Sequence, residues 1–195
     1  MFRNPVEVRD ATPEDAEALL AIWADFSKRV HPSPEPLEVQ TAAAVARIVA
    51  DPDERLIVAV ADDAVVGAAH LRRAPISPIF NDTAIHVSHL HVLDACRRRG
   101  VGRALMEASV TWAEEKETGH LVAAASANSR DANRFLARLG LAQIAVVRGA
   151  TVPAVRSKLP VEAPAFARVT SRSSRAVGQV LAHRRSQRRS QAKVS

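Results

Sequence analysis

The sequence lacks features that would indicate several classes of protein. It contains no tyrosine, which excludes a tyrosine hydroxyl from its chemistry. Its single cysteine, Cys96, cannot form a disulfide within the chain, so the expected location is the reducing cytoplasm. No apolar run approaches the roughly 18 residues that span a membrane. The first residues also lack the apolar core of a secretory signal.

Positive charge is unevenly distributed along the chain. The formal net charge is +6 over 195 residues, yet residues 161–195 hold eight arginine or lysine residues and one acid, Glu162. Residues 1–160 are therefore close to neutral, and the basic character belongs to the C-terminal end. We expect a folded domain over residues 1–160 and a basic, disordered tail over 161–195.

Hydrophobic patterning predicts alternating strands and helices before the tail. Apolar alternation and buried apolar runs indicate strands, whereas apolar residues at spacings of three and four indicate amphipathic helices. Strands are expected at 6–11, 56–61, 64–71, 84–93, 121–126, 141–147 and 151–159, and helices at 13–30, 37–50, 100–118 and 131–139. This β-α-α-β-β-β-α-β-α-β-β order predicts an α/β fold, in which helices flank a central mixed sheet.

The stretch CRRRGVGRAL, residues 96–105, joins the end of an apolar strand to the start of a helix. The N–H groups of a first helical turn have no internal partner and carry partial positive charge. Gly100 and Gly102 lack the Cβ atoms that would keep a ligand away, and four arginines surround them. The pattern predicts a cradle for a diphosphate. A solvated basic turn that eases the chain into a helix is the alternative interpretation.

The segment HLHVLDACRRRGVGRALMEAS resembles the central motif of the GNAT superfamily of N-acetyltransferases. Arg97, Gly100 and Gly102 match the motif Arg/Gln-x-x-Gly-x-Gly/Ala. The resemblance extends over residues 5–159 through weaker matches, including VEVRDATPEDAEAL and NSRDANRFLARLGL. It implies a GNAT-like fold and the transfer of an acetyl group from acetyl-CoA to an amine of a small molecule or a protein.

The resemblance also implies which residues bind acetyl-CoA. Main-chain groups of Leu90 and Val92, in the strand before the motif, would hydrogen-bond the pantetheine arm, and an amide near Val92 would polarise the thioester carbonyl. Asn128 and Asn133 are candidates for polar contacts to pantetheine or ribose. The alternative is that Asn128 is a turn residue and that Asn133 is an exposed position on a helix. The residues that would hold the phosphates are Arg97, Arg98, Arg99, Gly100, Val101, Gly102, Arg103 and Ala104.

Two positions leave the catalytic chemistry open. Members of the family often carry a tyrosine that protonates the departing thiolate, and the matching position here is Leu136. Either water or another residue replaces it, or the chain is a catalytically silent acyl-CoA-binding module. Some members place a glutamate base where this chain has His86, whose imidazole is suited to taking a proton from an ammonium. A half-buried or surface histidine without a catalytic role is the alternative.

Other reactive side chains near the motif have weaker claims. His89 and His91 are lesser candidates for the base, and on a regular strand they would share a face opposite to that of His86. The HVSHLH cluster has no aligned third ligand, so no metal is expected. Cys96 is expected to pack against the core rather than to act as a nucleophile.

Partners are least specified by the sequence. The acceptor amine matches no specificity signature. The tail over 161–195 suits nucleic acid, an acidic protein or an anionic membrane surface, and a solvating tail without a partner is the alternative. A nucleic-acid-associated protein that acts through this tail is therefore a further hypothesis. A second copy of the chain, in a homodimer, is another candidate partner.

Overall fold

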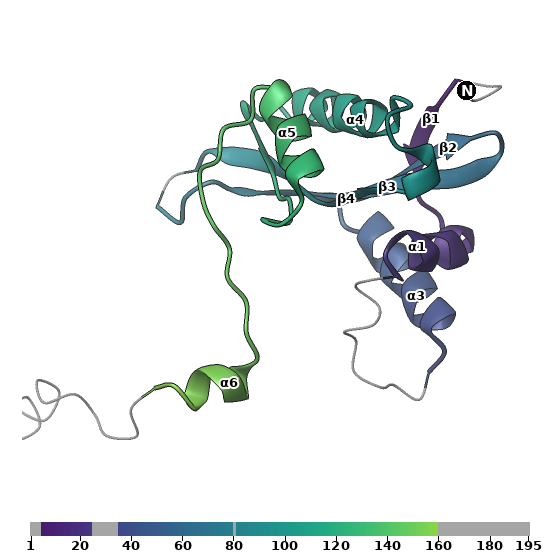
Figure 1. Cartoon of the computed structure of the whole chain (residues 1–195). Coiled ribbons are helices and arrows are strands. Elements are labelled where there is room, and N and C mark those ends of the chain that lie inside the picture. The colour runs from purple at the N-terminus through teal and green to yellow at the C-terminus, as the bar shows by residue number, and fades with distance from the viewer. Residues whose placement is uncertain (1–4, 25–34, 80, 160–195) are drawn as a thin grey trace, which may run out of the picture. The chain divides into compact units, whose positions relative to one another are not determined.

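The computed structural model describes residues 5–24, 35–79 and 81–159. The chain divides into two units, residues 1–144 and 145–195, and the predicted boundary at residue 160 stays a prediction. Figure 1 shows the elements. The first unit contains β1 (Glu7–Asp10), η1 (Pro13–Asp15), α1 (Ala16–Ile22), α3 (Leu37–Val49), β2 (Glu54–Ala61), β3 (Ala64–Pro75), β4 (Thr83–Val92), η2 (Asp94–Cys96), α4 (Val101–Glu115), β5 (His120–Ala123) and α5 (Arg130–Arg138), and the second contains α6 (Val152–Arg156).

The five strands of the first unit form one mixed sheet in the order β1-β2-β3-β4-β5. Neighbouring strands are antiparallel except for β4 and β5, which are parallel. The β2–β3 hairpin turns at Asp62 and Asp63, whose φ angles are 49° and 63°. Positive φ at both central residues matches the twist of the flanking strands, and aspartate tolerates it. The predicted mixed sheet flanked by helices is confirmed.

Helices cover both faces of this sheet (Figure 1). On one face, α4 places Val101, Leu105 and Trp112 against β3 and β4, and α5 adds partly buried side chains to the same cluster. On the other face, α1 and α3 pack Leu19 and Val45 against β2 and β3. Burying side chains of this size is worth roughly 1.5–3 kcal/mol each, so these two clusters hold the helices to the sheet.

Asp15 fixes the start of α1 relative to β1. Its carboxylate accepts hydrogen bonds from both terminal nitrogens of Arg9, at 2.7 and 2.8 Å, and from the Thr12 N–H at 2.8 Å. Arg9, through these hydrogen bonds above all, holds the pKa of Asp15 below its usual value. The predicted helix start at Thr12 and Pro13 is confirmed, whereas the C-terminal part of the helix expected at 13–30 lies partly outside the described residues.

The strands predicted at 141–147 and 151–159 are wrong. Residues 141–150 have no regular secondary structure, and Val147 is 93% exposed. The second segment instead forms α6, where the Ala154 N–H donates to Thr151 Oγ and Pro153 occupies the first turn. Proline is favoured at that place in a helix and disfavoured in a strand. Because its expected partner is helical, the apolar 141–147 segment has no antiparallel strand there with which to pair.

Candidate functional site

A β-bulge interrupts β4 immediately before the predicted site. His70 of β3 pairs with Ser88, and Ala68 pairs with His91. One residue of β3 therefore faces two residues of β4. His89, one of these two, has a φ of 54°, in the left-handed region that β-bulges commonly use. The bulge locally bends β4 and takes its main chain out of regular pairing.

The bulge corrects the predicted orientation of the histidines. His86 and His91 pair with Arg72 and Ala68, which are four residues apart on one strand and so lie on one face. His86 and His91 therefore share a face. The expectation that His86 lies opposite to His91 is wrong, because a strict two-residue period does not survive an inserted residue.

One edge of β4 is open beyond the bulge. Pairing with β5 runs only from Ala84 to Val87, and the last bond is from the Ala124 N–H to Val87 O at 2.9 Å. Within the part of the chain that the structure describes, no strand pairs with this edge after Val87. Leu90 and Val92 belong to the unpaired stretch, where an extended ligand can add to the sheet as another strand would.

The turn after β4 presents main-chain N–H groups. Arg98 and Gly100 have φ angles of 61° and 87°, and successive groups in such conformations form concave anion sites. The Ala104 N–H donates to Gly100 O at 3.0 Å, so the three preceding N–H groups at the start of α4 have no intrahelical acceptor. A Cβ on Gly100 would meet nothing within 4 Å. This cradle fits the diphosphate that the sequence pattern predicts.

The arginines of the turn differ in how their side chains are held. Arg97 is engaged within the protein, because its guanidinium lies 2.7 Å from Asp94 Oδ1 and its Nε donates to Val92 O at 3.3 Å. It therefore fastens the turn to the end of β4. The other basic side chains around the start of α4 are exposed, namely Arg98, Arg99 and Arg103.

The start of α4 lies close against the sheet because β3 has a glycine there. A Cβ on Gly67 would come within 3.0 Å of both Val101 Cγ1 and His91 O. Val101 itself is 1% exposed, so its contribution to a ligand is limited to its main chain. Tight packing at Gly67 thus fixes the cradle relative to the open edge of β4.

The predicted site residues in and before α5 differ in their contacts. Asn133 Nδ2 donates to Ser126 O and Ser129 O, at 3.0 and 2.7 Å, which orders the loop between β5 and α5. Asn128 is exposed. Leu136 is partly buried against the α4 cluster, so the position where the family often has tyrosine is occupied by a packing residue. Neither asparagine is brought to the cradle by a contact that the structure records.

The histidines of β4 have different surroundings. His86 Nε2 is buried without a hydrogen-bond partner. His89 is exposed at the bulge, where its carbonyl accepts a hydrogen bond from Trp23 Nε1 at 2.9 Å. Partial burial, and to a lesser extent the charge of His70, lowers the pKa of His89 below its usual value. The lowered pKa favours the neutral form of the His89 imidazole over the imidazolium.

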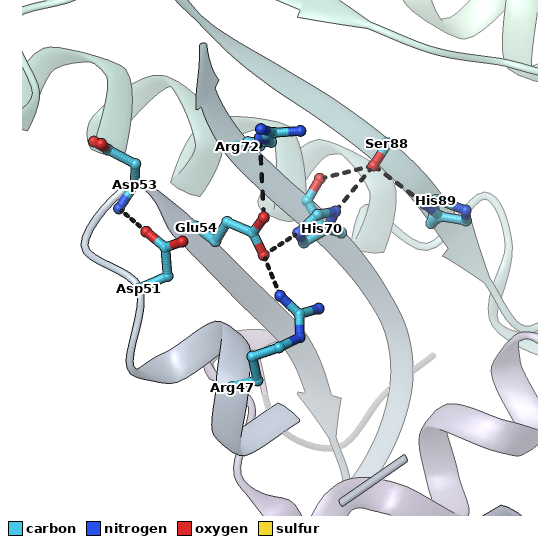
Figure 2. A network of polar contacts seen from close by, with 8 residues as sticks. All are labelled: Arg47, Asp51, Asp53, Glu54, His70, Arg72, Ser88 and His89. Carbon is cyan, nitrogen blue, oxygen red and sulfur yellow. Dashed lines mark hydrogen bonds and ion pairs between the residues drawn. The ribbon is translucent and has the colours of Figure 1, made fainter. Parts of the chain in front are cut away.

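A polar network on the α1 and α3 face was not predicted from the sequence. It joins Glu54, His70 and Ser88 across β2, β3 and β4, as Figure 2 shows. The available signal was polarity inside an apolar strand, since His70 follows the apolar run AVVGAA. Nothing in the sequence alone indicated that the register would bring these three residues together.

The described residues contain no group of three or more histidine, cysteine, aspartate or glutamate side chains that could hold a metal ion. In the same part of the chain, no helix has the length and apolar character needed to cross a membrane. Cys96 is partly buried and packs against the core cluster, in agreement with its expected role.

Residues 17–141 match the family model described as "Acetyltransferase (GNAT) family". This chain belongs to the GNAT acetyltransferase family. Membership agrees with the bulged, partly unpaired β4 and the cradle that follows it, and it indicates acetyl transfer from acetyl-CoA as the general activity. Curated protein sequences include none that is significantly similar to the chain.

Solved structures of other proteins, N-acetyltransferases among them, have the same fold. A ribosomal-protein-alanine N-acetyltransferase from Brucella melitensis biovar Abortus 2308 is 19% identical, with 75% of this chain and 99% of that chain covered and a TM-score of 0.60. An aminoglycoside N-acetyltransferase in complex with CoA is 16% identical, with 77% and 98% covered and a TM-score of 0.62. A transcriptional regulator from Bacillus halodurans C-125 is 24% identical, with 76% and 99% covered and a TM-score of 0.63.

Proposed function

We propose that this protein is an acetyl-CoA-dependent N-acetyltransferase, which moves the acetyl group directly to an amine of a small molecule or a protein. The observation that carries the proposal is the continuity of two features. The β4 edge that faces β5 is unpaired beyond Val87, and the N–H cradle at Gly100 follows β4 within a few residues. The first feature suits an extended pantetheine arm and the second suits a diphosphate.

Specific parts of the chain would hold the cosubstrate. Acetyl-CoA supplies an acetyl group that is already activated as a thioester. The main chain of Leu90 and Val92 offers hydrogen bonds along the open edge. The phosphates would be held by the main chain from Arg98 to Ala104 and by the side chains of Arg98, Arg99 and Arg103, while Arg97 keeps the turn in place through Asp94.

A residue of β4 would remove the proton from the amine. His86 is the proposed base, because it lies on the face covered by α1 and α3 and its buried Nε2 has no hydrogen-bond partner in the protein. An imidazole there can take a proton from an ammonium at neutral pH. Leu136 cannot donate a proton to the leaving thiolate, but a thiolate of ordinary pKa, about 8.5, leaves without much assistance.

The test is thiol release by the full-length protein with acetyl-CoA and a panel of amines. The named activities of its structural neighbours suggest an aminoglycoside, a peptide that begins with alanine and glucosamine 6-phosphate. We expect thiol release only when both acetyl-CoA and a productive amine are present, with one acetylated amine formed per thiol as measured by mass spectrometry. Thiol release without any acetylated amine would contradict the proposal.

A catalytically silent acyl-CoA-binding module is the second candidate. Leu136 favours it, because this side chain packs against the core where many family members have a proton donor. This alternative predicts micromolar or tighter binding of acetyl-CoA together with no turnover on any amine of the panel. The same assay, run beside a calorimetric titration, therefore separates the two functions.

A further inference from the structure

Four side chains form a continuous polar chain across three strands (Figure 2). His89 Nδ1 lies 3.1 Å from Ser88 Oγ, and Ser88 Oγ lies 3.2 Å from His70 Nδ1. His70 Nε2 in turn lies 3.4 Å from Glu54 Oε2. Cross-strand pairing of His70 with Ser88 and of Glu54 with Arg72 brings these residues to one face of the sheet.

The inner end of this chain is enclosed and charged. The Glu54 side chain is 14% exposed, and Arg47 and Arg72 lie 3.5 and 3.9 Å from its carboxylate oxygens. His70 Nε2 is buried and makes no hydrogen bond of good geometry. Its contact with Glu54 is therefore an ion-pair separation, which becomes strongly favourable when the imidazole gains a proton.

Two opposite directions of donation along the chain satisfy hydrogen counting, and the relay requires one of them. A serine hydroxyl has one hydrogen to donate, and a neutral histidine has one donor and one acceptor nitrogen. If His89 Nδ1 donates to Ser88, then Ser88 donates to His70 Nδ1, and the His70 proton sits on Nε2 toward Glu54. The Ser88 hydroxyl also lies 3.5 Å from the His70 carbonyl oxygen. This contact is longer, so we assign it to a less populated orientation of the hydroxyl.

The outer end of the chain lies at the open edge of β4. Ser88 is the first residue after Val87, where pairing with β5 stops. His89 is exposed beside Trp23, at the end of α1. Ser88 and His89 therefore directly follow the last residue of β4 that pairs with β5, at the point where the open edge begins.

We propose that His89, Ser88, His70 and Glu54 form a proton relay that takes the second proton from the acceptor amine. This inference rests on the proposed N-acetyltransferase function and deepens it. An ammonium loses two protons on becoming an amide: one before attack, assigned to His86, and one as the C–N bond forms. The relay receives the second.

The proton balance of the relay is as follows. The amine nitrogen forms a bond to the acetyl carbon, the C–S bond breaks with its electron pair going to sulfur, and the N–H proton passes to Ser88 Oγ, directly or through His89. The Ser88 hydroxyl proton moves to His70 Nδ1, and Glu54 balances the resulting imidazolium. His86 and His70 then each release one proton to solvent, and the thiolate takes up one proton, so one proton is released overall. Among the described residues, the charged and titratable groups on this face include Arg47, Glu54, His70, Arg72, His86, His89 and His91.

Three relay variants of the full-length protein test the proposal, namely Ser88→Ala, His70→Asn and the double variant. His86→Ala is compared with them, and His120→Asn, an exposed histidine on β5, is the matched control. Each variant is assayed for kcat/KM against pH with the amine of the panel that is acetylated fastest. Acetyl-CoA affinity and thermal unfolding are measured in parallel.

The relay predicts a specific pattern. Ser88→Ala and His70→Asn each lower kcat/KM at least about tenfold, and the double variant is no slower than the worse single one, because both residues serve one path. His86→Ala recovers as pH rises and the amine loses its first proton unaided, whereas the relay variants do not recover. Acetyl-CoA affinity is unchanged in all of them. Relay variants within about twofold of the His120→Asn control, or effects that multiply in the double variant, would overturn the relay.

A second measurement does not depend on turnover. The nitrogen-15 chemical shifts of imidazole report which ring nitrogen carries the proton in a neutral histidine. We expect His70 to be protonated on Nε2 in the wild type and to lose this preference in Ser88→Ala. A His70 protonated on Nδ1 refutes the relay by itself. If His70 has the expected tautomer but the protein acetylates no amine, the proposed function is refuted. The relay then has no acceptor from which to take a proton.

Discussion

At the scale of single residues, the candidate site depends on where each side chain is already engaged. Arg97 contacts Asp94 and the Val92 carbonyl, so it fastens the turn to β4 and is assigned a positioning role. His86 Nε2, by contrast, is buried and has no hydrogen-bond partner. A buried polar atom without a partner costs free energy. A substrate that hydrogen-bonds to His86 Nε2 would remove this cost, which is consistent with a place in the site.

His86→Ala should lower the rate of acetyl transfer at neutral pH. The rate should partly recover as pH rises, because the acceptor amine then loses its first proton without help. Initial rates of thiol release measured across the pH range provide the test. Full activity with an unchanged pH profile would remove His86 from the mechanism.

Asp15→Asn should destabilise the fold without affecting the site. The folded-state pKa of Asp15 lies below its usual value of about 4. The ionised carboxylate therefore stabilises the fold above that value, and the contribution is lost as pH falls through the folded pKa. We expect the free energy of unfolding to fall by about 1–2 kcal/mol at neutral pH, since solvent partly screens Arg9.

Urea unfolding at neutral pH and at about pH 2 measures this effect. The difference between wild type and variant should shrink at the lower pH. Glu17→Gln, an exposed position on the same helix, is the control and should be close to neutral. A penalty for Asp15→Asn that is the same at both pH values would contradict the assigned ion pair.

At the scale of secondary-structure elements, the sequence predicts an element correctly where its local pattern is enough to define it. The amphipathic stripe predicted α4, and the apolar run with an Asp62–Asp63 turn predicted the β2–β3 hairpin. The predictions that are wrong concern segments that need a strand from elsewhere in the chain to pair with. The alternating residues 141–147 required a neighbouring strand, and the segment expected to supply it contains a capped helix.

The candidate site shows the same division. The cradle at Gly100 was predictable because glycine, arginine and a helix start are contiguous in the sequence. The bulge at His89 was not, because one inserted residue leaves no trace in an apolar pattern. The contact of His70 with Ser88 and Glu54 depends on the register of three strands, which a single sequence does not specify.

Gly67→Ala should weaken both the fold and the cradle. The added methyl group would come within 3.0 Å of Val101 Cγ1 and His91 O, so the start of α4 must move away from the sheet. Overpacking of this kind costs about 1–3 kcal/mol, and we expect weaker acetyl-CoA binding with it. Gly119→Ala, where nothing lies within 4 Å, is the matched control for melting temperature and affinity. Equal behaviour of the two variants would refute the close-packing account.

At the scale of the whole molecule, the excess positive charge and the proposed acetyl-CoA site lie in different parts of the chain. The proposed site lies in the near-neutral residues 1–160, and the basic cluster HRRSQRRS lies in residues 161–195, outside the described residues. The hypothesis of a nucleic-acid partner therefore stays a prediction that can be tested independently of acetyl transfer.

Removing residues 161–195 should abolish any binding to DNA or RNA while acetyl-CoA binding persists. Full-length protein should bind a labelled duplex at low salt, with affinity that falls steeply as salt rises, because eight cationic side chains in the tail are available for phosphate contacts. Fluorescence anisotropy at several salt concentrations measures both proteins. No binding by the full-length chain at low salt would end the nucleic-acid hypothesis.

The affinity of Gly102→Glu for acetyl-CoA, measured by isothermal titration calorimetry, tests the central claim most directly. A Cβ at this position meets Phe135 at an ordinary 3.5 Å, so the fold should tolerate the change, while the new carboxylate opposes the phosphates. We predict a dissociation constant at least about tenfold above that of wild type, with Gly102→Ala and Gly119→Glu close to wild type. An unchanged affinity in Gly102→Glu would contradict the assignment of the α4 N-terminus as the site that binds acetyl-CoA.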